Sequence, residues 1–147
     1  MQSYWSKQEQ QVAPSCIVSP VFIENVSAAI KILTANNLTC KFAIRSDGHT
    51  TQAGSANIER GVTIDMSAFK DIRLSVDHTL VTIDSGQRWG NVYATLEPFG
   101  LAVPGDRATE VDVGGLLLEG WSVEFFCIVS MNRLLPDIYF YYVLFVS

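Results

Sequence analysis

The sequence of 147 residues has few cysteines, few basic residues and no apolar run long enough to cross a membrane. Its three cysteines cannot form a closed set of disulfides and lack the spacing of a metal site. Ten basic against fifteen acidic residues give a net charge of −5, so we expect no nucleic-acid partner. The longest apolar run, 138–146, has nine residues, whereas a membrane-spanning helix needs about 20. The polar N-terminus has no signal-peptide pattern.

Hydrophobic residues make up 48% of the chain, which indicates a folded domain rather than a disordered segment. Short apolar runs predict strands at 16–18 and 101–104, and alternation of apolar and other residues predicts strands at 40–45 and 61–66. A hairpin is predicted from 74–76 and 80–84. Apolar residues at helical spacing predict helices over 24–37 and 89–96. Elements in this order indicate an α+β or α/β fold.

The sharpest candidate site is the segment R-S-D-G-H-T-T at 45–51, which follows a predicted strand. Gly48 permits a tight turn, the turn exposes backbone N–H groups, and the hydroxyls of Ser46 and Thr50 can donate hydrogen bonds. These properties suit the binding of an anion. The alternative is an ordinary Asp-Gly turn that joins two elements.

A second Gly-containing segment lies in the predicted loop 105–120, where V-G-G-L occupies 113–116. Paired glycines between apolar residues allow close approach of the backbone to a ligand, although such pairs also occur in plain turns. Neither segment has the glycine spacing of a Rossmann or P-loop motif. Two such loops in one small domain favour a ligand that carries phosphate.

The other cysteine, histidine, aromatic and carboxylate side chains singled out in the sequence are expected to have structural rather than functional roles. Cys40 is predicted as a buried thiol and His78 as a solvated turn residue. The remaining candidates are two aromatic residues expected in the core and two strand-end carboxylates expected in water: Trp89 and Tyr93, then Asp65 and Asp84. We predict no catalytic residue and no metal ligand.

Eight short motifs occur together in one order along 4–126. They are Y-W-S at 4–6, P-x-C-I-V-x-P at 14–20, F-A-I-R-S-x-G-H at 42–49, A-G-S-A-N-I at 53–58, G-V-T-I-D-M-S at 61–67, G-x-R-W-G-x-V-Y at 86–93, L-E-P-x-G-L-A-V at 96–103 and V-G-G-L-L-L-x-G at 113–120. As an ensemble, they make the chain resemble the flavin-binding domain of FAD-linked oxidases of the vanillyl-alcohol-oxidase and berberine-bridge type, especially fungal ones.

The resemblance implies an α+β, PCMH-type FAD-binding fold: the first α/β subdomain and the start of the second, without the substrate domain. It divides the chain into an extension at 1–13, an incomplete FAD-binding domain at 14–126 and an apolar tail at 127–147. We expect that tail to come from a retained intron or a shifted frame. In the family, hydride passes from an alcohol, sugar or similar carbon to the flavin, and O2 reoxidises it. Family members are often secreted.

The resemblance also implies the cofactor residues. The pyrophosphate loop would comprise Arg45, Ser46, Asp47, Gly48, His49 and Thr50, and the other side of FAD would be lined by Val113, Gly114, Gly115 and Leu116. His49 would be the residue able to bond covalently to the flavin. Because Ala108 stands where some members carry a second flavin-linking cysteine, we expect at most this one covalent link.

Three acidic residues depart from the family pattern. Asp47 and Asp112 stand where the family has glycine, and Glu119 interrupts the second glycine run. A carboxylate close to a pyrophosphate is repelled by it. The departures therefore leave an alternative open: a non-catalytic fragment, or an interaction module, that no longer binds FAD. With no substrate domain or catalytic base, we expect no activity from the chain alone.

Overall fold

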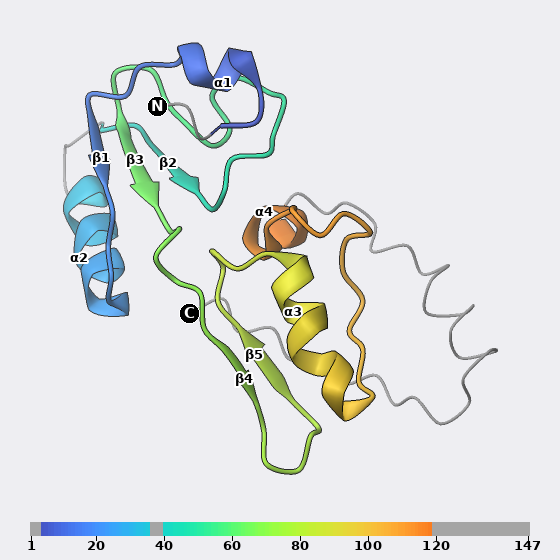
Figure 1. The fold of residues 1–147 in the computed structure, drawn as a ribbon. Helices are drawn as coiled ribbons and strands as arrows, with labels where there is room; N and C mark the ends of the chain where they lie inside the picture. The colour runs from blue at the N-terminus through green and yellow to red at the C-terminus, as the bar shows by residue number, and fades with distance from the viewer. Residues whose placement is uncertain (1–3, 36–39, 119–147) are drawn as a thin grey trace. The chain divides into compact units, whose positions relative to one another are not determined.

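The computed structural model describes residues 4–35 and 40–118. The chain divides between Phe69 and Lys70 into two compact units. Unit 1 takes its described residues from before this boundary and unit 2 from after it. Each unit has its own helices and strands (Figure 1). Each also has its own hydrophobic core.

Unit 1 is built on a three-stranded parallel sheet. Its strands are β1 (Cys16–Val18), β2 (Phe42–Arg45) and β3 (Val62–Asp65), in the spatial order β1-β3-β2. The register pairs Cys16 and Phe42 with opposite sides of Val62, so β3 is the central strand. All three strands agree with the sequence prediction to within two residues at each end. Since both outer strands run parallel to β3, the carboxyl ends of all three lie at one edge of the sheet.

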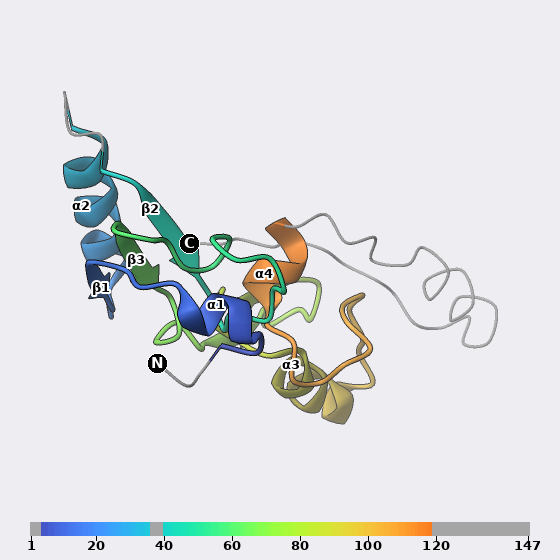
Figure 2. The same cartoon turned by 90° about the horizontal axis from the view of Figure 1, so that it is seen from above.

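The core of unit 1 lies between this sheet and helix α2 (Ile23–Thr34). Ile64, Met66 and Phe69 are buried, and the helix contributes the apolar stripe of Val26, Ala29, Ile30 and Leu33. Figures 1 and 2 both show α2 beside the sheet. The predicted helix 24–37 is therefore confirmed in its described part, and its expected end at 36–37 lies outside the described residues.

A second helix of unit 1, α1 (Lys7–Gln11), is not predicted by the sequence pattern. Its N-cap is Ser6, whose Oγ accepts a hydrogen bond from the Glu9 N–H at 3.2 Å. This is the N-cap arrangement that short polar residues provide. Glu9 is fully buried although it is charged and lies on a five-residue helix. Because the segment is polar, its sequence does not predict that it packs against the rest of unit 1.

Unit 2 combines a hairpin with helices. It contains strands β4 (Ile72–Leu74) and β5 (Val81–Ile83), helix α3 (Trp89–Leu96), the 3-10 turn η1 (Glu97–Phe99) and helix α4 (Val113–Leu118). The strands pair antiparallel, as predicted, but β4 overlaps the predicted segment 74–76 only at Leu74. Helix α3 has its predicted bounds. After η1, Gly100 adopts a left-handed conformation with φ of 66° and ends the helical segment.

Two predictions for unit 2 are wrong. No strand forms at 101–104; Leu101 and Val103 instead pack as irregular chain against the core. The glycine pair expected in a loop lies in α4, where Val113 joins the buried cluster Val81, Ile83, Trp89, Val92, Leu96 and Val113. Packing of this apolar face outweighs the low helix propensity of glycine. None of the described helices is long and apolar enough to span a membrane.

Candidate functional site

The first predicted site, 45–50, lies at the carboxyl edge of the parallel sheet, where β2 ends. Its turn depends on Gly48, which has a φ of +84°. A Cβ built on Gly48 would lie 2.6 Å from Cδ1 of Tyr4, closer than van der Waals contact permits. Both the backbone conformation and the packed Tyr4 ring therefore require glycine.

Several hydrogen-bond donors gather in this loop. The N–H groups of Gly48, Thr50 and Thr51 make no hydrogen bond to any residue in the described ranges 4–35 and 40–118. The Thr50 Oγ1 accepts from the N–H of Gln52 at 3.2 Å, which leaves its own proton to donate. Amide donors that lie close together in a turn at a strand end form the kind of concavity that binds anions.

Arg45 supports the loop from within unit 1. Its guanidinium lies 4.0 Å from the centroid of the Tyr4 ring and 3.6 Å from Oδ2 of Asp65. It also donates to the carbonyl of Asp47 at 3.4 Å. Burial raises the pKa of the Tyr4 phenol, and the Arg45 charge opposes that shift only in part. The ring is thus neutral at physiological pH and presents its face to a cation.

Asp65 corrects the expectation that both strand-end carboxylates are solvated. Its side chain is only 16% exposed, because it pairs with Arg45 and accepts from the Ser67 N–H at 2.9 Å. The sequence places Asp65 at the end of a strand, but only the parallel register shows that Arg45 lies directly opposite it. The ion pair therefore joins the ends of β2 and β3 beneath the loop.

His49 and Asp47 form a close pair within the same loop. The His49 Nδ1 lies 3.6 Å from Oδ2 of Asp47, and their side chains are 27% and 21% exposed. Asp47 is therefore partly buried beside the imidazole rather than fully solvated. A carboxylate here adds negative charge next to the amide donors, which weakens an otherwise suitable anion site.

In the second predicted site, the backbone N–H groups already donate hydrogen bonds at the N-terminus of helix α4. The N–H groups of Val113, Gly114 and Gly115 donate to the Gln87 carbonyl at 2.8 Å, the Ser85 carbonyl at 3.1 Å and the Asp112 Oδ2 at 2.8 Å, respectively. The next predicted residue, Leu116, packs against the core of unit 2. The first-turn amides of α4 thus have protein acceptors, and Asp112, which is 3% exposed, supplies one of them.

For the other residues singled out in the sequence, the structure confirms some of the expected positions and corrects others. Cys40 is exposed rather than buried, because β2 begins only at Phe42 and leaves the cysteine outside the sheet. His78 is an exposed turn residue, as predicted, with a φ of 57° and its ring 4.9 Å from that of Phe99. Trp89 is fully buried in the core. Within the described residues, no cluster of side chains could hold a metal ion.

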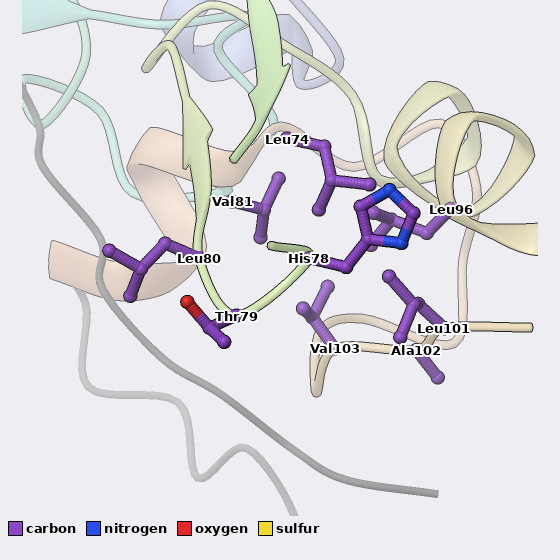
Figure 3. A pocket seen from close by; sticks show the side chains of 9 residues that line it. All are labelled: Leu74, His78, Thr79, Leu80, Val81, Leu96, Leu101, Ala102 and Val103. Carbon is purple, nitrogen blue, oxygen red and sulfur yellow. The ribbon is translucent and has the colours of Figure 1, made fainter. Parts of the chain in front are cut away.

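Unit 2 also contains a small, largely apolar pocket beneath the hairpin turn, shown in Figure 3. Its lining comes from β4 and β5, the turn between them, the end of α3 and the chain after η1: Leu74, His78, Thr79, Leu80, Val81, Leu96, Leu101, Ala102 and Val103. None of these is a predicted cofactor residue. The pocket therefore gives no support to the cofactor assignment.

Solved structures resemble this fold at low sequence identity. CrmK, a flavoenzyme of caerulomycin biosynthesis, matches 70% of this chain and 20% of its own with a TM-score of 0.61 and 21% identity. GilR, an oxidoreductase of gilvocarcin biosynthesis, matches 68% of this chain and 20% of its own with a TM-score of 0.58 and 23% identity. These likenesses show the fold.

Curated fungal proteins resemble the sequence more closely. The FAD-dependent monooxygenase sdcF of Emericella nidulans is 44% identical over 110 residues, which cover 75% of this chain and 23% of that protein. The FAD-dependent monooxygenase tpcD of Cochliobolus heterostrophus is 37% identical over 117 residues, covering 80% of this chain and 22% of that protein. The chain spans about a fifth of the length of these relatives.

The family comparison agrees with the resemblance seen in the motifs. The model of the FAD binding domain matches residues 14–137, which is most of the chain. The match includes the first loop after β2 and all of α4. The PCMH-type fold and FAD as the family's cofactor, both expected from the sequence, are confirmed. This chain belongs to the FAD binding domain family.

Proposed function

We propose that this chain is the FAD-binding portion of an FAD-dependent oxidoreductase and that the loop 45–50 holds the FAD pyrophosphate. The observation that carries the proposal is the group of amide donors at Gly48, Thr50 and Thr51, placed at the carboxyl edge of a parallel sheet. Ligands of open α/β sheets bind at this edge. The family match supplies the identity of the ligand.

The residues of this loop fit a pyrophosphate in all but one respect. Amide and hydroxyl donors from Gly48, Thr50 and Ser46 are suited to phosphate oxygens. Arg45 contributes by holding the loop, since its guanidinium is already engaged with Tyr4 and Asp65. Asp47 opposes an anion. Since the repulsion comes from one partly solvated carboxylate, we expect weaker binding rather than none.

When bound, FAD would supply the redox chemistry of an oxidase, accepting hydride from a substrate carbon and passing electrons to O2. The protein residues bind and orient it. We propose His49 as the covalent attachment residue, because it follows Gly48 directly in the donor loop and its imidazole is partly exposed.

The second loop is proposed to contribute shape rather than hydrogen bonds. Val113, Gly114, Gly115 and Leu116 would line FAD through their surfaces, because the first three donate their N–H groups to protein acceptors. We propose further that the chain alone binds flavin without turnover. It spans about a fifth of the relatives named as monooxygenases, and the sequence assigns no catalytic residue.

Flavin absorbance of the purified chain tests this proposal. We expect a yellow protein, or one that becomes yellow with added FAD, whose flavin stays with the precipitate after acid treatment. His49→Ala should bind FAD but release it on precipitation. His78→Ala, the other histidine, is the matched control and should behave like the wild type. A colourless chain that takes up no FAD would establish the alternative, a fragment without cofactor binding.

A further inference from the structure

The segment before β1 contacts the cofactor loop at both of its ends. We propose that Tyr4, Trp5 and Glu9, here called the N-terminal clamp, are positioning residues that hold the loop 46–57 in its binding conformation before FAD arrives. The clamp lies outside the region that matches the FAD binding domain, which begins only at residue 14. The inference depends on the proposed function only for the identity of the ligand.

At the near end of the loop, the clamp holds Gly48. The Tyr4 residue is 3% exposed, and its ring packs against the Gly48 backbone so closely that a Cβ would overlap it. The Trp5 N–H donates to the Gly48 carbonyl at 3.1 Å, which ties the two backbones together. On the same ring lies the Arg45 guanidinium, 4.0 Å from the centroid. Tyr4 thereby links the strand end to the turn.

At the far end of the loop, the clamp holds Ser55 and Ala56. The Glu9 Oε1 accepts from the Ser55 N–H at 2.9 Å and from the Ala56 N–H at 3.0 Å. A buried carboxylate that accepts two amide hydrogen bonds makes charge-assisted contacts, which are stronger than neutral ones. The next residue, Asn57, donates to the carbonyl of Val12 at 2.9 Å.

These contacts bear on binding because the middle of the loop is exposed. Residues 51–55 are exposed, and the N–H groups of Gly48, Thr50 and Thr51 have no acceptor within the described part of the chain. Ordering such a loop costs conformational entropy. If the clamp orders it in advance, FAD binding does not have to bear that cost. The clamp would thus raise affinity without touching the ligand.

The test measures loop order and FAD affinity separately, on the full chain. Tyr4→Leu and Tyr4→Met remove the aromatic face, Glu9→Ala removes the acceptor, and Tyr4→Phe and Gln8→Ala are the controls. We expect the NMR order parameters of Gly48 and Thr50 to fall from about 0.85 to below about 0.6 in the first group. Their dissociation constants for FAD should rise about tenfold, and the controls should stay within about twofold of the wild type.

Each outcome decides between the alternatives. Unchanged order parameters and affinity in folded Tyr4→Leu or Tyr4→Met would overturn the inference. Flexible loops with unchanged affinity would overturn it as well, since the clamp would then have only a structural role. A wild type that binds no FAD would refute the proposed function. Even then, a loop that becomes flexible only in the clamp variants would show that the clamp orders the loop. Exchange of the β3 amides reports whether unit 1 remains folded.

Discussion

At the scale of single residues, Gly48 offers the sharpest test of the packing in unit 1. Gly48→Ala places a methyl group 2.6 Å from Cδ1 of Tyr4 and imposes a φ of +84° on alanine. Gly54→Ala imposes a φ of +90° with no atom within 4 Å. We expect Gly54→Ala to cost about 1 kcal/mol of unfolding free energy through the backbone alone. Gly48→Ala should cost about 1–3 kcal/mol more through overpacking.

Urea unfolding followed by far-UV circular dichroism measures both losses. The pair is matched because the two glycines lie in the same loop and differ mainly in what surrounds them. Equal losses in the two variants would mean that the Tyr4 ring moves aside, and the packing argument for Gly48 would then fail.

Asp77 gives a prediction about pH at the turn of the hairpin. Hydrogen bonds from Ser75 and Thr79 lower the pKa of its carboxyl from the ordinary 3.8. Because the folded-state pKa is the lower one, the contribution to stability is present above pH 3.8 and is lost as pH falls through the folded-state pKa. Asp77→Ala should therefore melt at a lower temperature than the wild type near pH 6, with the difference shrinking below pH 3.8.

Thermal unfolding at a series of pH values checks this expectation. Asp106→Ala is an informative companion, since Asp106 also accepts an amide hydrogen bond, from Ala108 at 2.7 Å, in another turn of unit 2. A difference between wild type and Asp77→Ala that grew on acidification would reverse the sign of the linkage and contradict the assignment.

At the scale of elements, helix α4 depends on its cap. Asp112 accepts from the Gly115 N–H at 2.8 Å and is 3% exposed, and α4 has only six residues with two glycines. Asp112→Ala should cost about 1–2 kcal/mol of unfolding free energy, because the cap is lost and a buried donor is left without an acceptor. Asp112→Asn retains the acceptor and should lose much less.

The fluorescence of Trp89 during denaturation provides the measurement, since Trp89 is fully buried in the cluster that includes Val113 of α4. Asp71→Ala, at an exposed position of the same unit, serves as the control. Equal stability of Asp112→Ala and Asp112→Asn would show that the cap does not determine the stability of the helix.

The helices and strands also show which parts of the fold can be predicted from the sequence. Strands β1, β2 and β3 and helices α2 and α3 follow from periodicity, because each has a regular apolar pattern. Periodicity does not predict α4, because glycines have low helix propensity and its stability comes from Asp112 and the unit-2 core. Nor does it predict α1, because the residue it buries is Glu9, whose partners Ser55 and Ala56 lie more than 40 residues away. Long-range pairing of this kind leaves no local pattern.

Some features of the candidate site can likewise be predicted from the sequence, and others cannot. The donor loop after β2 is visible in the sequence, because Gly48 and the neighbouring hydroxyls are local signals. The pairing of Arg45 with Asp65 is not, because it depends on the register of two parallel strands. Likewise, the contact of Tyr4 with Gly48 joins segments that no motif connects. The sequence thus indicates the proposed ligand-facing residues, and the structure adds those that hold them.

At the scale of the whole molecule, charge works against an anionic ligand. The chain carries a net charge of −5, and Asp47 places one of its carboxylates in the proposed pyrophosphate loop. Salt screens such repulsion, with a Debye length of about 8 Å at physiological ionic strength. We therefore expect FAD affinity to rise as salt increases from about 20 to 200 mM, opposite to the behaviour of a basic site.

Asp47→Gly separates the local carboxylate from the overall charge. If repulsion at the loop dominates, this substitution should raise FAD affinity by about three- to tenfold and flatten the salt dependence, since a carboxylate a few ångströms from a phosphate costs about 1 kcal/mol even in high dielectric. Glu24→Gln makes the same change in net charge at an exposed position of α2 and should leave both quantities nearly unchanged. Isothermal titration with FAD at several salt concentrations measures them. Equal effects of the two variants would mean that net charge, rather than the position of Asp47, sets the repulsion, and the placement of the pyrophosphate beside Asp47 would then lose its support.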